Sequence, residues 1–274
     1  MILRVMLKNY LNTGLADFNL AFKSFSLWLY LGFFDVKSKY RRSILGPWWL
    51  TLSTLTVILM LGFLWSKIFN QPIHEFLPYF GTGYIFWLWM SSQVLEASNG
   101  FGSFSNLIRQ QKISYFGLIL RLTIKNFLIL CHNSIIILFL ILFLLSYSDV
   151  EIIYFKYFLF FIGLGIVQIS LFFFCYIVAT ICTRYADFGQ IVGVIVQLVF
   201  FFTPIIWQVE SIKSSMMIID LNPIYHLITI IRDPLLGKTP FLNSYYISIS
   251  MMFIFGFLAM IFSGKYNKRI SFWI

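Results

Sequence analysis

The sequence has few charged residues. Only 11% of its 274 residues are Asp, Glu, Lys or Arg, whereas a soluble domain carries about 25%. Hydrophobic residues make up 60% of the chain and aromatic residues 20%. These proportions exclude a soluble globular protein, a disordered chain and a collagen-like chain. They are typical of a protein that is surrounded by lipid.

Motifs of enzymes and metal sites are also missing from the sequence. Three cysteines lie inside apolar runs without CxxC spacing: Cys131, Cys175 and Cys182. Three histidines lie far apart: His74, His132 and His226. Gly237-Lys238-Thr239 resembles the end of a phosphate-binding loop, but position 232 is Arg instead of the glycine that this loop needs. We therefore predict no cofactor, no metal site, no nucleotide site and no enzyme activity in this chain.

The sequence does contain a series of apolar runs. Their lengths are close to the ~20 residues that span a bilayer as a helix. Six spans are predicted, over about 48–66, 78–107, 126–146, 154–182, 188–207 and 245–262. The predicted fold class is therefore an all-α integral membrane protein with six transmembrane helices, which places both termini on the same side.

The predicted spans divide the chain into three parts. Residues 1–46 form an N-terminal segment, residues 47–264 the six-span transmembrane domain and residues 265–274 a tail. Phe18 to Lys39 is predicted as one amphipathic helix lying in the membrane surface, with Trp28 and Tyr30 at the depth of the lipid headgroups. An ordinary packing helix is the alternative interpretation.

Positive charge is distributed unevenly along the chain. The net charge is +10, which in a soluble protein would suggest nucleic acid. Fifteen of the 20 Lys and Arg lie in the N-terminal segment, in 109–125, in the 183–187 turn and in the tail. By the positive-inside rule these segments face the cytoplasm. The charge therefore predicts cytoplasmic termini and membrane-lipid contact, and no nucleic-acid partner.

A few polar and aromatic residues in the second span are candidates for lining a path. Glu96 is the one acidic residue within a confident span, and a carboxylate in lipid is costly enough to suggest a role. It is either a proton site or a group paired within the helix bundle, and we favour pairing. Tyr84, Trp87 and Trp89 form an interfacial belt or stack on sugar rings along a path.

Several segments, in their order and position, resemble a known family: the membrane permease subunits of type-2 ABC exporters for polysaccharides (O-antigen, capsule or teichoic acid). The resemblance covers roughly residues 37–235. The matching segments are Lys39-Tyr40-Arg41-Arg42-Ser43 with Leu45-Gly46-Pro47-Trp48, Pro78-Tyr79 with Gly83, Asn99-Gly100, Asn106-Leu107-Ile108, Arg121, Arg184-Tyr185-Ala186-Asp187-Phe188, Thr203-Pro204-Ile205, and Leu221-Asn222-Pro223 followed by Arg232.

The resemblance implies a homodimer of this chain with two separate ATP-hydrolysing subunits, which bind ATP and Mg²⁺. It implies export of a lipid-linked polysaccharide across the bacterial cytoplasmic (inner) membrane. A cytoplasmic coupling helix around 109–120 is expected to dock on each ATPase subunit. The residues expected in this contact are Arg109, Gln110, Gln111, Lys112, Ile113, Ser114, Tyr115 and Phe116.

The resemblance also implies roles for three smaller groups of residues. Residues after the break at Pro204 are expected to re-enter the membrane from outside and form an external gate, and 211–235 is indeed amphipathic and too polar to span. The gate residues are Pro204, Asn222, Pro223 and Arg232. Arg41 and Arg42 would attract the substrate's pyrophosphate or anionic headgroups, or serve topology alone. Arg184 and Asp187 would pair within their turn, or be solvated.

Three other functions are weighed against this one. A type-2 exporter of drugs or small lipids often has a larger outer domain between its first two spans, and the short loop Lys67 to Leu77 argues against it. An integral-membrane glycan enzyme needs acidic residues at the membrane edge, and no carboxylate pair stands out. An ion-coupled porter would depend on Glu96.

Overall fold

A computed structural model of the chain describes residues 2–39, 41, 43–46, 48–147, 154–209 and 219–274. Every regular element in these ranges is a helix, as the sequence predicts. The helices are α1 (Ile2–Lys23), α2 (Phe25–Lys39), α3 (Trp48–Ile68), α4 (Ile73–Ser98), the 3-10 helix η1 (Phe101–Phe104), α5 (Ser105–Gln110), α6 (Tyr115–Tyr147), α7 (Tyr154–Arg184), α8 (Asp187–Phe202), α10 (Pro223–Leu235) and α11 (Leu242–Trp273).

Four of the described helices are long and apolar enough to cross a membrane. They are Trp48–Ile68 (α3), Tyr115–Tyr147 (α6), Lys156–Arg184 (within α7) and Leu242–Trp273 (α11). The chain is therefore a multi-pass membrane protein. The other two predicted spans correspond to α4, which is 26 residues long, and to α8, an apolar helix of 16 residues.

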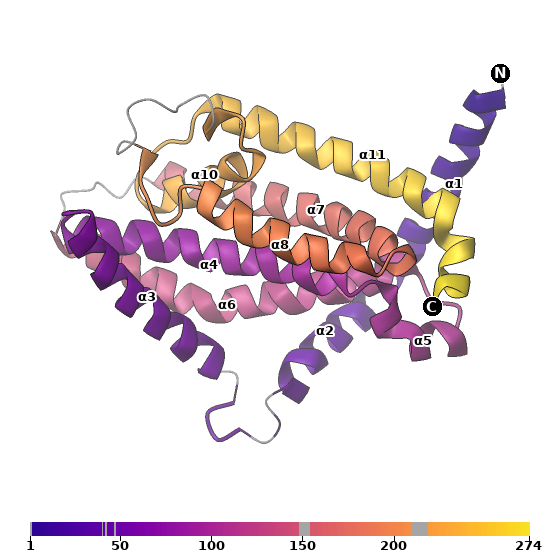
Figure 1. Ribbon diagram of the computed structural model, residues 1–274, viewed down its shortest axis with the longest axis horizontal. Helices are drawn as coiled ribbons and strands as arrows, with labels where there is room; N and C mark the ends of the chain where they lie inside the picture. Colours follow the sequence, from indigo (N-terminus) through magenta and orange to yellow (C-terminus); the bar gives the residue numbers. More distant parts are fainter. Residues whose placement is uncertain (1, 40, 42, 47, 148–153, 210–218) are drawn as a thin grey trace.

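Helices α4, α6, α7, α8 and α11 run along one another, and α3 lies at an angle to them (Figure 1). The two termini, α1 and α5 gather at one end of this bundle, and α10 lies at the other end (Figure 1). Successive long helices alternate in direction along the bundle (Figure 1). The turn between α7 and α8 consequently lies at the end that carries the termini.

Helix α4 lies at the centre of the bundle. It packs against α3, α6, α7, α8 and α10, and its buried side chains face in several directions, as those of Phe76, Phe80, Phe86 and Trp89 do. Because α4 is surrounded by protein rather than by lipid, it tolerates the polar side chains that lower its hydropathy. This location explains why α4 is not among the four helices named above, although the sequence predicts a span there.

The N-terminal segment contains two helices instead of the single helix predicted over Phe18 to Lys39. The chain turns at Ser24, whose carbonyl accepts hydrogen bonds from the first residues of α2, Leu27 (3.0 Å) and Trp28 (3.3 Å). The turn is needed because α1 packs against α11 while α2 packs against α6. In the contact with α11 a methyl group at Gly264 would overlap the carbonyl of Tyr10, so the two backbones touch.

The face of α2 that packs against α6 is made of Trp28, Gly32 and Val36. Trp28 was predicted at headgroup depth, but its indole is buried against Gly117. Tyr30, in contrast, is 66% exposed. The apolar side chains of Phe25, Leu29 and Phe33 in α2 are exposed as well. Helix α2 therefore uses one face for protein and leaves an apolar face for lipid.

The ends of several helices differ from the predicted span boundaries. The second span was expected to reach Leu107, but α4 ends at Ser98 because Gly100 has a φ of 66°, in the left-handed region that glycine favours. A side chain at Gly100 would also meet Thr183 of α7. The third span was expected to begin at 126, whereas α6 already begins at Tyr115.

Candidate functional site

The segment between α4 and α6 contains a short helix and an extended link. The single helix predicted around 109–120 was wrong, since α5 ends at Gln110 and Gln111 is extended (φ −142°, ψ 148°). Helix α6 then begins at Tyr115, because Ser114 caps it: the Gly117 N–H donates a hydrogen bond of 3.1 Å to Ser114 Oγ. A serine at this position satisfies a backbone donor that the helix leaves unpaired.

The eight predicted coupling residues differ in burial: some are exposed, some partly buried and some buried. Exposed residues form a continuous stretch: Arg109, Gln110, Gln111 and Lys112. We call these four residues the α5 surface. Ser114 and Phe116 are buried, the Phe116 ring stacking 4.1 Å from Tyr176, while Ile113 and Tyr115 are partly buried. A partner protein can therefore contact the α5 surface but not Ser114 or Phe116.

Asp17 of α1 is a second cap for α6 that the sequence analysis missed. Its Oδ2 accepts a hydrogen bond of 3.2 Å from the Phe116 N–H, and its carbonyl accepts one of 3.0 Å from Ser114 Oγ. A carboxylate is favourable at a helix N-terminus because of the helix dipole. Burial nevertheless raises the pKa of Asp17, although these hydrogen bonds oppose the rise. Helix α1 thereby fixes the point at which α6 begins.

Two cations one turn apart on α6 bind acidic residues of two other helices. Arg121 forms a bidentate ion pair with Asp35 of α2, at 2.7 Å from Nε and 2.6 Å from Nη2. Lys125 pairs with Glu96 of α4. Arg121 also lies over the ring of Phe104 in η1, 5.7 Å from its centroid. The two ion pairs fix α2 and α4 to α6, and the contact with Phe104 fixes η1 to α6. All three contacts lie next to the α5 surface.

The carboxylate of Glu96 has two partners on α6. Besides the pair with Lys125, its Oε2 accepts a hydrogen bond of 3.0 Å from Asn126 Nδ2. Asn126 Oδ1 in turn accepts one of 3.0 Å from Ser92 Oγ. Glu96 was interpreted as either a proton site or a group paired within the helix bundle, and the geometry corresponds to the paired group. A charged side chain at membrane depth is retained when it has such a partner.

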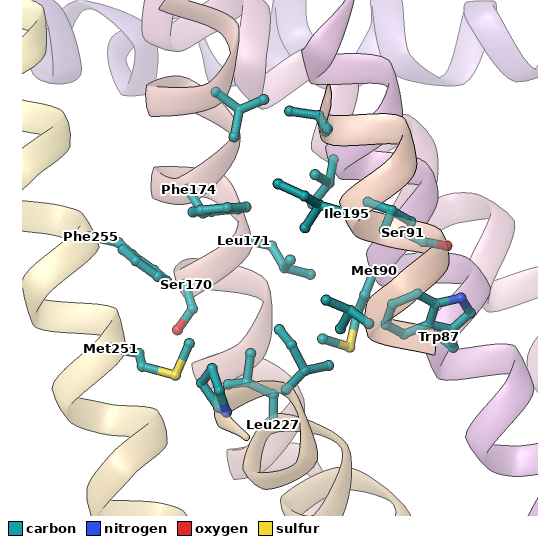
Figure 2. A pocket seen from close by; sticks show the side chains of 17 residues that line it. Trp87, Met90, Ser91, Ser170, Leu171, Phe174, Ile195, Leu227, Met251 and Phe255 are labelled. Atoms are coloured by element: carbon teal, nitrogen blue, oxygen red, sulfur yellow. The ribbon is translucent and has the colours of Figure 1, made fainter. Parts of the chain in front are cut away.

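The three aromatic candidates of α4 lie inside the protomer. Trp87 and Trp89 are buried and Tyr84 is half-buried. Tyr84 and Trp87 both contact Phe200 of α8, with ring centroids 6.4 and 5.6 Å apart. Trp87 also lines an apolar cavity between α4 and its neighbours (Figure 2). These rings join α4 to α8 and do not form a belt at a lipid interface.

The predicted gate residues come together at the opposite end from the termini. Asn222 caps α10, since its Oδ1 accepts hydrogen bonds from the N–H groups of Ile224 (3.0 Å) and Tyr225 (3.4 Å). Its Nδ2 donates to Thr203 Oγ1 at 3.1 Å. Pro223 occupies the first position of α10, where a missing N–H has no cost. Asn222 thus links the start of α10 to the end of α8.

Arg232 connects three parts of the chain at this end. It is only 3% exposed, and its Nη1 donates a hydrogen bond of 2.7 Å to the carbonyl of Pro204. Its guanidinium lies 4.1 Å from the centroid of the Tyr79 ring, and the Tyr79 hydroxyl donates to the same carbonyl at 3.0 Å. Asp233 lies 3.6 Å away. Arg232 therefore holds α10, α4 and the turn after α8 in one arrangement.

The remaining predicted site residues are at the end with the termini. Arg184 lies over the rings of Tyr185 and Trp273, 5.2 and 5.0 Å from their centroids. The ion pairs of the described residues do not include one between Arg184 and Asp187, and both residues are exposed, which corresponds to the solvated alternative. Asp187 instead lies in the first turn of α8, where the helix dipole favours it.

Some predicted residues fall outside the described ranges. Arg41 is exposed, but its neighbour Arg42 is not among the described residues. The same holds for most of the polar stretch that precedes α10, residues 210–218. Among the residues that are described, no three His, Cys, Asp or Glu side chains cluster so that they could hold a metal.

The cap at Asp17 predicts a specific pH dependence. Folding raises the pKa of Asp17, so the folded state binds the proton more tightly than the unfolded state does. Above the folded-state pKa the buried carboxylate is charged and lowers the free energy of unfolding. This destabilisation disappears as the pH falls through that pKa. Asp17→Asn keeps an acceptor for the Phe116 N–H and removes this cost. We expect it to be at least as stable as the wild type at neutral pH, with the difference shrinking as the pH falls.

Asp17→Leu is the matched control, because it removes the acceptor as well as the charge. We expect it to lower the free energy of unfolding by about 1 kcal/mol, the usual effect of losing a cap. Thermal unfolding of the detergent-solubilised protein at several pH values measures both variants. Equal destabilisation by Asn and Leu would contradict the cap.

A substitution at Arg232 tests the junction of α4, α10 and the turn. Arg232→Met keeps the length of the side chain but removes the charged donor to Pro204, so we expect a loss of about 2 kcal/mol of stability. Tyr79→Phe removes one neutral hydrogen bond and should cost about 1 kcal/mol. Thermal unfolding of the two variants measures which of them is less stable. The account of this junction fails if Arg232→Met is no less stable than Tyr79→Phe.

Comparison with known proteins shows the family of this chain. Residues 27–236 match the family model described as ABC-2 type transporter. The chain is similar to the O-antigen export system permease protein RfbA of Klebsiella pneumoniae, with 23% identity over 222 residues that cover 78% of this chain and 81% of the relative. Since the family match extends from α2 to the end of α10, this protein belongs to the ABC-2 type transporter family, whose members are permease subunits of ABC transporters.

Proposed function

We propose that this chain is the membrane subunit of an ATP-driven exporter that moves a lipid-linked polysaccharide across the bacterial cytoplasmic membrane. Family membership supports a permease that relies on separate ATP-binding subunits. The observation that carries the choice of substrate is the similarity to a relative named as an O-antigen export permease. The four residues between α3 and α4, 69–72, leave no room there for the outer domain that many drug exporters have.

The proposed topology has six spans: α3, α4, α6, α7, α8 and α11. The segments rich in Lys and Arg support it, because the N-terminal helices, the α5 surface, the turn after α7 and the tail lie toward one end of the bundle (Figure 1). By the positive-inside rule that end faces the cytoplasm. Both termini are then cytoplasmic, and α2 rests on the inner leaflet with its exposed apolar face in lipid.

The α5 surface is the proposed docking site for the ATPase subunit. It is exposed and carries two cations, Arg109 and Lys112, while both of its ends are held firmly. On one side Asp17 and Ser114 fix the start of α6, and on the other the Arg121 and Lys125 pairs fix α2 and α4 to α6. A displacement of this surface is therefore passed to α4 and α6 rather than absorbed locally.

The proposed mechanism requires a homodimer and no covalent chemistry in this chain. ATP binding closes the two ATPase subunits and displaces both docked α5 surfaces. The two sets of six spans shift relative to each other, and the path between the protomers opens to the lipid-linked glycan. At the outer end α10 acts as the gate, with Arg232 holding it against α4 in the arrangement described above.

Charge reversal on the α5 surface tests this function. In the native host, with the chromosomal copy deleted, we expect wild-type chain to restore surface polysaccharide and Arg109→Glu/Lys112→Glu not to. We propose that the ATPase surface facing these two cations is acidic, so the same variant should lose at least about tenfold in affinity, since like charges brought together at an interface cost several kcal/mol. Co-purification and immunoblots of surface glycan provide the two measurements.

The control reverses one Lys and one Arg elsewhere at the same end. Lys268→Glu/Arg269→Glu alters two exposed residues of the tail and should leave both glycan export and ATPase binding in place. Equal ATPase binding by both double variants would overturn the docking site. Deletion that leaves surface glycan intact and sensitises the cells to drugs would favour a drug exporter instead.

A further inference from the structure

The end of α11 lies beside α5, at the end of the bundle that carries the α5 surface (Figure 1). We call residues 267–274 the α11 end. Its inner face is packed into the bundle, since Ile270 has no exposed surface and Asn267 Oδ1 accepts a hydrogen bond of 2.6 Å from the hydroxyl of Tyr176 in α7. The α11 end is therefore a fixed part of the bundle.

Two contacts join the α11 end to segments that are far away in the sequence. Arg109 of the α5 surface donates a hydrogen bond of 2.8 Å from Nη2 to the carbonyl of Ile274. The ring centroid of Trp273 lies 5.0 Å from the guanidinium of Arg184, which also lies 5.2 Å from the ring centroid of Tyr185. Two successive residues, 273 and 274, thus contact the α5 surface and the turn between α7 and α8.

The contact with this turn leads to α8. The cap and the ion pairs described above join the α5 surface to α1, α2, α4 and α6, whereas the turn at Arg184 is followed directly by α8, which begins at Asp187. Arg184 is exposed and has no ion pair among the described residues, so the aromatic rings hold its guanidinium. Helix η1 holds the end of α7 as well, because the Phe101 N–H donates a hydrogen bond of 2.8 Å to Thr183 Oγ1.

We propose that Trp273 is a positioning residue that couples the start of α8 to the α5 surface. The inference rests on the proposed function, in which closure of the ATPase subunits displaces the α5 surface. A displacement of Arg109 moves the α11 end through the carbonyl of Ile274, and the ring of Trp273 moves Arg184 and the start of α8 with it. In this role Trp273 needs to contact neither the ATPase nor the glycan.

Three variants of the full chain, produced with its ATPase subunit in the native host, test this role. Trp273→Ala removes the ring, Trp273→Phe keeps an aromatic face for Arg184, and Arg184→Gln removes the cation. We expect Trp273→Ala and Arg184→Gln each to lower surface glycan by at least about threefold, the equilibrium effect of losing an exposed cation–π contact. Trp273→Phe should retain most of the export. The ATPase should co-purify with all three and continue to hydrolyse ATP, so that less glycan is exported per ATP.

Phe272→Ala is the matched control, because it removes an aromatic ring from the neighbouring residue, which is 85% exposed. We expect it to export as much glycan per ATP as the wild type. The double variant Arg184→Gln/Trp273→Ala should be no worse than either single variant, because all three lose the same contact. Since Arg184 is exposed, Arg184→Gln tests the contact even if Trp273→Ala does not fold.

Spin labels measure the positions of the two segments without relying on glycan export. Nitroxides are attached to Gln111→Cys and Ala186→Cys, two exposed positions, in a chain whose three native cysteines are replaced by serine. Double electron–electron resonance then gives the distribution of distances between the labels. We expect a narrow distribution in the wild type and in Phe272→Ala, and a broader one in Trp273→Ala and Arg184→Gln.

Three outcomes would overturn the proposal. One is an equal loss of export in Phe272→Ala and Trp273→Ala. Another is a distance distribution that is the same in Trp273→Ala as in the wild type. The third is loss of the ATPase subunit from Trp273→Ala, which would make the α11 end a second docking site. Failure of the proposed function gives a different result: deletion of the chain leaves surface glycan intact, while the spin labels still report whether Trp273 positions the turn.

Discussion

The arrangement of this protein depends on two ion pairs made by one helix. Arg121 and Lys125 lie one turn apart on α6 and bind Asp35 of α2 and Glu96 of α4. A partly buried charge is retained in such surroundings when it is paired, and removing one partner leaves the other exposed to the full cost of desolvation. The pairs therefore fix α2 and α4 to α6. The exposed residues of the α5 surface lie between elements that cannot move independently.

Helix α4 joins this end of the bundle to the other. Glu96 near its C-terminus takes part in the ion pairs, and Tyr79 near its N-terminus meets Arg232 and the carbonyl of Pro204. In the proposed exporter, a motion imposed on the α5 surface reaches the gate through this one helix. Helix α8, which buries no side chain along its length, lies beside α4 and the apolar cavity. Its contact with the core is made by partly buried side chains, among them Val196, Val199 and Phe200.

Sequence patterns predict the features that depend on the chain's own composition. The apolar runs give the helical membrane fold, and the grouping of Lys and Arg matches the end where the termini lie. Features set by contacts between distant segments could not be predicted. The start of α6 depends on Asp17 from α1, the burial of Trp28 depends on Gly117, and Arg184 lies over Trp273 near the end of the chain. Each partner is far away in the sequence.

Cysteine accessibility tests the central claim, that the α5 surface faces the cytoplasm and is covered by the ATPase subunit. Lys112→Cys and Thr239→Cys would be compared in a background without the exposed Cys131, using a membrane-impermeant maleimide. The account predicts that position 239 reacts in intact cells. Position 112 should react only in inside-out vesicles stripped of the ATPase, and be protected when the ATPase is bound. Labelling of position 112 in intact cells, or equal labelling with and without the ATPase, would contradict it.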